Sequence, residues 1–310
     1  MNRSIFFFFL IFPFFLAGKS PAAEPKDEDT LKPVYVTSTR LKDVEEKTSR
    51  ISHKVVVIDS KDIQRLGART VQEVLQYQSG VVLYDLIGNE FQSTVDLRGF
   101  NGQPVPATTV FVDGVRVNEP DFNTINFDLI PIEDIDKIEI HYGPGPLFGR
   151  NSLAGVINIK TKRGKRDKPR FEAEVGGGSY GRQKYRFNTY GPLPIPDFDY
   201  YFGLTRELSD GYRDSSGGRI TRILAKLGYR LGSSTDVTLA YTRINDKLKQ
   251  AGSLPKSVLR VRRKANITED DFSDGDLDLV ALNIRQELSS GFSLVGNGFY
   301  RDHARHSLVV

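Results

Sequence analysis

Cysteine and tryptophan are absent from this 310-residue chain, and methionine occurs once. Without cysteine the chain has no disulfide, no thiolate nucleophile and no cysteine-type zinc site. Of the four histidines, His303 and His306 are three residues apart in an expected strand, where they would face opposite sides. No serine–histidine–aspartate or paired-carboxylate pattern stands out. We therefore expect no metal site, no cofactor and no enzymatic activity.

A strong excess of one charge is also missing. The net charge is +4, with a pI near 9.0, and the basic residues are scattered along the chain. A nucleic-acid-binding protein would gather its lysines and arginines on one face or stripe. We therefore expect no nucleic-acid partner.

Long apolar runs are missing except for one, IFFFFLIFPFFLAG, which follows Arg3. A bilayer-spanning helix needs about 20 apolar residues, and Pro13 interrupts this run. The positive start, the short apolar core and the small residues up to Ala23 predict a secretory signal peptide over residues 1–23. The mature protein would leave the cytoplasm. If it enters a membrane, it must do so as a closed β-barrel, because no other stretch could form a spanning helix.

Residues 24–50 are expected to be a flexible N-terminal segment, since EPKDEDTLK has no apolar pattern. One short β-prone stretch, PVYVTSTR (residues 33–40), interrupts it. An extended segment of this kind can add itself as a strand to the sheet edge of another protein. It can equally be the first strand of the next domain, and the residues alone favour neither interpretation.

Residues 51–163 predict a small mixed α/β domain. HKVVVIDS, STVDLRGF, TTVFVDGVRV and GVINIKTKRG are expected strands, and Asp113-Gly114 between apolar runs indicates a hairpin. Two short helices are expected in SKDIQRLGARTVQEVLQYQSGV, with Ser60 and Thr70 as N-cap candidates. IEDIDKIEIHYG predicts a helical turn that feeds a strand.

From residue 164 to residue 310 helical periodicity is lost and long stretches alternate with a period of two. In RILAKLGYRL, for example, apolar residues alternate with Arg222, Lys226 and Arg230. About seven such strands of roughly 9–12 residues fit, which is the length of tilted barrel strands. A face of apolar residues opposite a face of charged ones is the outer-membrane barrel pattern, apolar to lipid and polar to the lumen. A soluble sandwich with one wet face is the alternative, but its strands average about 5–6 residues.

The links between these strands support a barrel. The links after the second, fourth and sixth strands are short, namely PLPIP, GSS and SSG. The link after the third is longer, and the link after the fifth is expected to run from Asn245 to Asp276. Short periplasmic turns and long outer loops alternate in this way in a barrel. The first link, GGSYG, is short and does not follow the rule.

The stretch IEIHYGPGPLFGRNSLAGVINIK (residues 138–160) resembles a phosphate-binding loop at first sight. A dinucleotide fingerprint needs a helix that starts at the glycines, so that its amides face the pyrophosphate. Here Pro144 and Pro146 remove two backbone N–H groups, and a β-run follows. We therefore expect a rigid, sharply bent link between two strands.

The acidic stretch EDDFSDGDLD (residues 269–278) resembles a calcium loop. If Gly275 takes the sixth position of such a loop, Phe272 and Ala281 fall where liganding oxygens belong. A solvated outer loop is the expected interpretation.

Several motifs together resemble the TonB-dependent outer-membrane receptor family. They are similar to the family's plug domain in order and spacing, and KPVYVTSTR stands where the family carries its TonB box. The plug motifs are TVQEVLQYQSGV, VDLRGF, TVFVDGVRVN, DLIPIEDIDKIEIHYGPGPLFG and LAGVINIKTK. The implied fold is an α+β plug domain followed by antiparallel transmembrane β-barrel strands. The resemblance covers the chain from about residue 30 onwards.

The resemblance assigns roles to particular residues. The implied TonB box is Pro33, Val34, Tyr35, Val36 and Thr37. Structural plug-motif residues are Arg98, Gly99, Phe100, Asp113, Gly114, Gly143, Pro144 and Gly149. Candidate ligand contacts in the apical plug loops are Tyr84, Phe91, Phe100 and Gln103. Arg98 is expected to pair with barrel carboxylates, which would be a structural role.

The implied function is active uptake of a scarce nutrient, above all a ferric siderophore, by a monomer in the outer membrane. Its partners would be TonB, outer-membrane lipid and an extracellular ligand such as a metal chelate. The alternative is a soluble periplasmic plug-like binding or signalling module. Members of this family resemble one another in having a barrel of about 22 strands, which is wide enough to hold a plug. We therefore expect a fragment of a receptor, with an incomplete barrel.

Overall fold

The computed structural model describes residues 34–38, 45–47, 51–85, 87–100, 107–120, 123–289 and 292–309. The predicted signal peptide therefore lies outside the described residues. No helix in the described ranges is long and apolar enough to cross a bilayer.

A five-stranded mixed sheet is the centre of the N-terminal domain, which we call the plug. Its spatial order is β3–β8–β9–β6–β7, with β6 and β9 parallel and the other neighbours antiparallel. The bounds are β3 (Val55–Asp59), β6 (Thr108–Val112), β7 (Val115–Arg116), β8 (Ile135–Tyr142) and β9 (Gly155–Thr161). The hairpin expected at Asp113-Gly114 joins β6 to β7, so that prediction is confirmed.

Two short helices and a two-stranded ribbon complete the plug. They are α1 (Ser60–Leu66), α2 (Val71–Gln76), β4 (Val81–Tyr84) and β5 (Thr94–Leu97). Thr70 caps α2 as expected, through its side chain and the amide of Glu73. Ser60 is not the cap of α1. Asp59 takes that place because its carboxylate accepts from the amides of Lys61 and Asp62.

Four 3-10 turns lie between these elements in the described ranges. They are η2 (Glu90–Gln92), η3 (Phe127–Leu129), η4 (Ile132–Asp134) and η5 (Pro146–Phe148). The turn η4 leads directly into β8, so the predicted helical turn before a strand is confirmed. Isoleucine, valine and leucine side chains from the helices, the ribbon and the sheet form the plug core.

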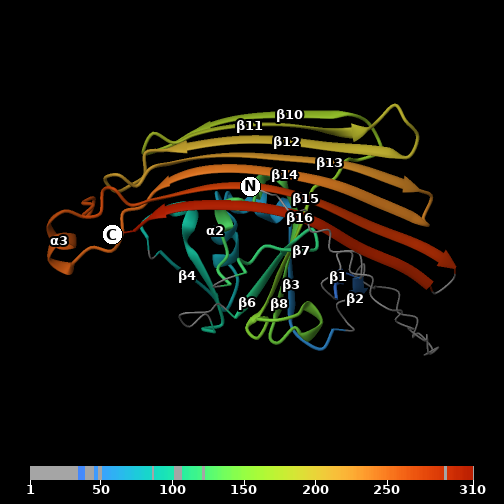
Figure 1. The fold of residues 1–310 in the computed structure, drawn as a ribbon, viewed down its shortest axis with the longest axis horizontal. Helices are drawn as coiled ribbons and strands as arrows, with labels where there is room; N and C mark the ends of the chain where they lie inside the picture. The colour runs from blue at the N-terminus through green and yellow to red at the C-terminus, as the bar shows by residue number, and fades with distance from the viewer. Residues whose placement is uncertain are drawn as a thin grey trace, which may run out of the picture.

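Seven antiparallel strands follow, each paired with its neighbours in sequence, as predicted. They are β10 (Arg170–Gly177), β11 (Gln183–Pro192), β12 (Phe198–Ser209), β13 (Gly218–Leu231), β14 (Thr235–Lys249), β15 (Phe272–Ser289) and β16 (Phe292–Leu308). They arch over one side of the plug (Figure 1). We call this sheet the barrel wall. It is open, with β10 and β16 at its two edges, so the barrel is incomplete.

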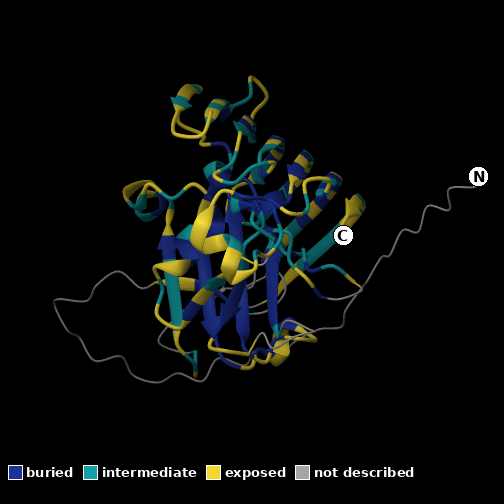
Figure 2. Cartoon of the chain, turned by 90° about the vertical axis from the view of Figure 1, so that its left-hand side faces the viewer, coloured by how far each residue is buried: buried dark blue, intermediate teal, exposed yellow. Residues whose placement is uncertain are grey.

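The two faces of the wall differ as the alternation predicts. Val175 and Leu227 on the outer face are 78% and 41% exposed, whereas Arg222 and Lys226 on the inner face are 3% and 4% exposed. Viewed along the wall, the strands of the plug sheet are mostly buried (Figure 2). Apolar residues also join the two parts, and Phe91, Val115 and Leu129 of the plug pack with β13, β14 and β15.

The longest link is shorter than the sequence suggested. Because β14 continues to Lys249 and β15 begins at Phe272, the link comprises residues 250–271 and contains α3 (Lys256–Val261). Most of the acidic stretch 269–278 is therefore strand rather than outer loop. Cross-strand pairing holds it in place, since Asp274 and Asp276 face Lys247 and Asn245 in the ladder.

Gly155 is a site where the plug fold leaves no room for a side chain. A Cβ there would lie 2.3 Å from the carbonyl oxygen of His141 and 2.5 Å from Cδ2 of Leu97. We expect Gly155→Ala to destabilise the plug by about 1–3 kcal/mol, the range for overpacked cores. Gly296→Ala is the control, since its Cβ would meet nothing within 4 Å. Protease resistance of the folded receptor during heating measures both variants, and equal resistance would contradict the prediction.

Candidate functional site

The segment predicted to be the TonB box forms β1 (Tyr35–Thr37), which pairs antiparallel with β2 (Glu45–Lys47). Its side chains differ in exposure: Val34 and Tyr35 are 49% and 45% exposed, whereas Val36 and Thr37 are buried. Pro33 lies outside the described residues. The box role of these residues remains a prediction, but the described part is extended, as strand addition requires.

Glu139 of β8 holds the buried end of β1. Its Oε2 accepts from the amide of Thr37 at 3.0 Å, over a separation of 102 residues. The Nδ2 of Asn158 donates to the same oxygen at 2.8 Å and to Oγ1 of Thr37 at 2.9 Å. Lys137 lies 2.8 Å from Oε1 of Glu139 and donates to the carbonyl of Tyr35 at 3.3 Å. We call Lys137, Glu139 and Asn158 the seat of β1.

The Glu139 carboxylate is fully buried and yet charged. Burial alone would raise its pKa, but the neighbouring His141 and the charges of Lys160 and Lys137 outweigh that effect. The pKa of Glu139 is therefore held well below its usual range. An ionised acceptor makes stronger hydrogen bonds than a neutral one, so the seat is a strong partner for the Thr37 amide.

The glycine-rich stretch is the bent link that the sequence predicted. The amide of Gly143 donates to the carbonyl of Ala154, and the amide of Gly145 to that of Ser152, each at 3.0 Å. The Ser152 hydroxyl donates to the carbonyls of Gly145 and Gly149. The amides of Gly143 and Gly145 are thus already satisfied within the link between β8 and β9, and Pro144 contributes none.

Arg98 and Gly99 form a tight turn after β5, with φ values of 62° and 76°. The guanidinium of Arg98 lies over the ring of exposed Phe100, 5.9 Å from its centroid. Within the described residues Arg98 makes no ion pair, so the expected pairing with barrel carboxylates is not found there. The turn directs its side chain toward Gly143 rather than toward β10–β16.

Asp113, at the hairpin of β6 and β7, connects the plug to the wall. Its carboxylate accepts from the amide and hydroxyl of Thr161, at 3.1 and 2.5 Å. Lys226 of β13 lies 2.7 Å from it and also donates to the carbonyl of Thr161. Both charges of this pair are buried, and a buried charge that loses its partner is strongly destabilising. The sequence marked Asp113-Gly114 as a turn but did not indicate Lys226 as its partner.

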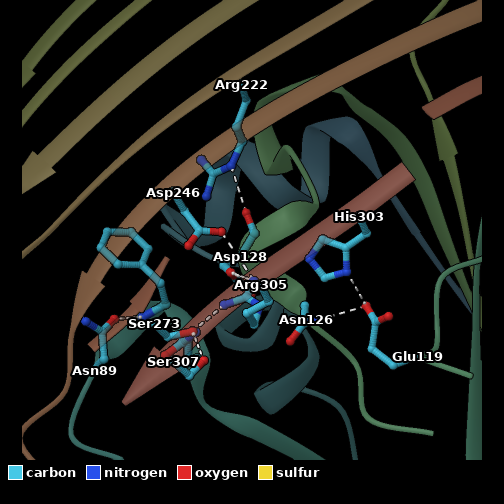
Figure 3. A network of polar contacts seen from close by, with 12 residues as sticks. Asn89, Glu119, Asn126, Asp128, Arg222, Asp246, Ser273, His303, Arg305 and Ser307 are labelled. Carbon is cyan, nitrogen blue, oxygen red and sulfur yellow. Dashed lines mark hydrogen bonds and ion pairs between the residues drawn. The ribbon is translucent and has the colours of Figure 1, made fainter. Parts of the chain in front are cut away.

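A polar network joins the plug segment that contains Glu119 and Asp128 to β13, β14 and β16 (Figure 3). Arg305 of β16 lies between Asp128 and Asp246, at 2.9 and 3.3 Å. Arg222 of β13 donates to the carbonyl of Asp128 at 3.1 Å.

Glu119 forms the second centre of this network. It accepts from Arg301 at 2.5 Å and lies 3.1 Å from Nδ1 of His303 (Figure 3). Burial would raise the pKa of Glu119, but the bonds to His303 and Arg301 lower it to about 2. His303 thus faces the plug while His306 is exposed, as the spacing predicted. Among the described residues no cluster of three or more histidines and carboxylates could hold a metal ion.

The candidate ligand residues lie in different environments. Tyr84 is 44% exposed, with its hydroxyl 3.3 Å from Asp96, and Phe100 is 45% exposed. Phe91 is 2% exposed and packs with β13, β14 and β15, so its ring is an interface contact in this structure. Gln103 lies outside the described residues. A ligand role for these residues remains a prediction.

The plug loop that carries these candidates is bonded to the longest link of the wall. The carbonyl of Ile87 accepts from the amides of Ala251 and Gly252 at 2.9 and 3.2 Å. The side chain of Asn89 donates to the carbonyl of Lys249 at 2.8 Å. The loop therefore lies at the end of the wall where α3 projects, opposite β1 and β2 (Figure 1).

The profile of the TonB-dependent Receptor Plug Domain family matches residues 47–156. A vitamin B12 transporter of Vibrio vulnificus (strain YJ016) is 27% identical over 294 residues, which are 84% of this chain and 46% of the relative. The rhizobactin receptor of Rhizobium meliloti (strain 1021) is 24% identical over 245 residues, 76% of this chain and 30% of the receptor. The chain therefore spans less than half the length of these relatives.

Solved structures share the same arrangement of plug and strands. The unliganded ferric citrate transporter FecA has a TM-score of 0.74 at 21% identity, with 83% of this chain and 40% of that one covered. The ferripyoverdine receptor of Pseudomonas aeruginosa has a TM-score of 0.72 at 16% identity, with 89% and 37% covered. With the plug motifs, the plug fold and the barrel wall all matched, the chain belongs to the TonB-dependent receptor family and carries its plug domain with part of its β-barrel.

Proposed function

We propose that the receptor containing this chain takes up a scarce nutrient across the outer membrane, in the form of an anionic metal chelate of the ferric siderophore kind. The export signal expected at residues 1–23, the apolar outer face of the wall and the family membership support outer-membrane placement. The observation that carries the choice of an anionic chelate is the charge of the longest link.

The tip of that link is strongly basic. Residues 254–264 contain five cations and no carboxylate. Arg262 pairs with Asp214 at 2.6 Å, and Lys264 lies over the rings of Tyr180 and Tyr212 at 5.6 and 5.8 Å. The remaining three cations, Lys256, Arg260 and Arg263, have no carboxylate partner in the described part of the chain. An unneutralised cluster of this kind attracts anions and raises their local concentration.

Several hydrogen bonds hold the base of the same link. The guanidinium of Arg213 donates to the carbonyl of Ala265 at 2.8 and 3.1 Å and also bonds the carbonyl of Gly252. Asn266 donates to the carbonyls of Ser215 and Gln250. Since the plug carbonyl of Ile87 also bonds this base, a ligand held at the tip acts close to the plug loop that carries Tyr84 and Phe91. Phe100 and Gln103 complete the proposed contacts.

On the periplasmic side we propose that residues 33–37 are the TonB box. Ligand occupancy at the outer end would free this segment, which would then add itself as a strand to TonB. The receptor would work as a monomer, because the plug, the box and the basic tip are all carried on one chain. The alternative of a soluble periplasmic module receives less support, since seven long strands with an apolar outer face follow the plug.

Reversal of two unpaired charges tests the anionic ligand. We expect Arg260→Glu with Arg263→Glu to weaken ligand binding on the order of tenfold at low salt. The loss should shrink at high salt, because screening removes the original attraction. Lys165→Glu with Lys168→Glu is the matched control, since these exposed lysines lie at the other end of the wall. Binding of ferric citrate, ferripyoverdine and vitamin B12 to cells is measured. Selective binding of vitamin B12, unaffected by the variants, would contradict the anionic-chelate proposal.

Substitution of proline for Val36 tests the box. Proline removes one backbone N–H that a strand-adding partner would use. We expect Val36→Pro to abolish uptake while ligand binding to the cell surface is kept. Val36→Ala keeps the N–H and should retain most uptake. Radiolabelled ligand bound and internalised by intact cells separates the two steps, and normal uptake by Val36→Pro would show that the box lies elsewhere.

A further inference from the structure

The outer face of the barrel wall carries an apolar band. Leu227, Leu239 and Leu282 stand in one row across β13, β14 and β15, and they are 41%, 45% and 38% exposed. On each strand this row lies in the middle of the outward apolar residues. Transmembrane barrels turn such a band, about 25 Å tall, toward lipid. In the proposed outer-membrane placement the row therefore marks the middle of the bilayer.

Three cations follow on the same face, toward the end of the wall where α3 projects (Figure 1). Arg219 of β13 lies directly opposite Lys247 of β14, and Lys249 follows two residues further along β14. All three side chains are exposed. Arg219 is eight residues from Leu227, which is about 27 Å along the strand and about 21 Å in height at a tilt of about 40°. Since half of the band is about 12 Å tall, these cations lie beyond the hydrocarbon.

The three cations have no carboxylate partner. Among the residues that the structure describes, none of the three makes an ion pair, whereas Arg243 on the same face of β14 pairs with Asp278. Like charges directly opposite each other destabilise a sheet, and Arg219 and Lys247 are placed in this way. A bound anion would offset this repulsion.

The same cations line an open groove of about 530 Å³ on the outer face of the wall. Arg219, Lys247 and Lys249 form its middle, on β13 and β14. Asp210 and Asp274 lie at its two sides, after β12 and on β15, and Asp274 faces Lys247 in the ladder without forming an ion pair. Ionised carboxylates accept hydrogen bonds and donate none, so they suit hydroxyl groups. The groove therefore fits a ligand with an anionic centre and hydroxyl groups around it.

We propose that this groove binds the headgroup of an anionic glycolipid of the outer leaflet. A phosphate carried on the sugars would bind the three cations, and sugar hydroxyls would donate to Asp210 and Asp274. Leu208 and Phe272, which also line the groove, supply apolar surface for the faces of the sugar rings. The inference rests on the proposed outer-membrane placement, and on neither the nutrient nor the TonB box.

The height of the groove favours a glycolipid over an ordinary phospholipid. The headgroup layer of an ordinary bilayer adds about 5–8 Å on each side, so it ends near Arg219 and below Lys249. A headgroup built of sugars extends further and carries its phosphates with it. Arg206, exposed on the outer face of β12 and closer to the apolar band, adds a cation where the headgroup joins the acyl chains.

Lipid binding by the full-length receptor tests the site. The receptor is stripped of lipid in a mild detergent and titrated with lipid A, a diglucosamine lipid with two sugar phosphates, and native mass spectrometry counts the bound lipid. We expect Arg219→Gln with Lys247→Gln to weaken binding at least tenfold, because charge-assisted contacts to phosphate are lost. Lys165→Gln with Lys168→Gln is the matched control, since it removes two exposed cations at the opposite end of the wall and should bind like the parent.

Heat resistance gives a second readout. Without lipid, Arg219→Gln should be at least as resistant as the parent, because it removes a like charge opposite Lys247. Saturating lipid A should raise the unfolding temperature of the parent by several degrees and that of Arg219→Gln by less, since a ligand stabilises the state that it binds. Arg206→Gln with Lys249→Gln should weaken binding severalfold, which keeps the site testable if the first pair of substitutions prevents folding.

Competing lipids decide what the groove recognises. Dephosphorylated lipid A and phosphatidylglycerol should each bind at least tenfold more weakly than lipid A. Equal binding of phosphatidylglycerol, or displacement of lipid A by inorganic phosphate, would contradict a glycolipid site. Unchanged binding of lipid A in both groove variants would also overturn it. Recovery of the full-length receptor outside the outer-membrane fraction would instead overturn the proposed placement itself.

Discussion

Charged side chains on the inner face of the barrel wall need partners, and the plug supplies them. Lys226 and Arg222 are buried where the wall meets the plug and Arg305 is partly buried there, and an unpaired charge at such a place would be costly. Each meets a plug oxygen, from Asp113, from the Asp128 carbonyl or from the Asp128 carboxylate. The position of the plug inside the wall depends on this matching together with the apolar cluster around Phe91, because charge pairs fix which residues meet whereas apolar contacts are non-directional.

The two ends of the plug differ in how they are held. At the outer end the plug loop is bonded to the link that carries α3, through Ile87 and Asn89. At the other end β1 is held by plug residues and by β2. The loop at the outer end lies between β4 and β5, whereas Glu139, which holds β1, lies on β8 of the five-stranded sheet. Both the ribbon and this sheet contribute side chains to the plug core, so a ligand at one end and a partner at the other would act on the same packed domain. This arrangement gives the proposed uptake cycle a continuous physical path through the plug.

Much of the architecture was predictable from local patterns. The period-two alternation predicted seven wall strands, and the Asp-Gly pair predicted the hairpin of β6 and β7. The prolines of the glycine-rich stretch predicted a bent link between two strands, and the link between β8 and β9 confirms it. Errors arose where cross-strand pairing overrides local composition. The composition of the acidic stretch 269–278 predicted a loop, but most of this stretch is strand because it pairs with β14.

By itself, the sequence determined the succession of elements, the two faces of the wall and the sites of the turns, because those depend on residues within a few positions of one another. Only the tertiary structure decided the charge partners. Thr37 meets Glu139 across 102 residues, and Lys226 meets Thr161 across 65. The same holds for Arg98, whose expected carboxylate partners are not found among the described residues because a turn points it toward Gly143. Such pairings depend on how the sheet and the wall approach in space, and no local pattern records that approach.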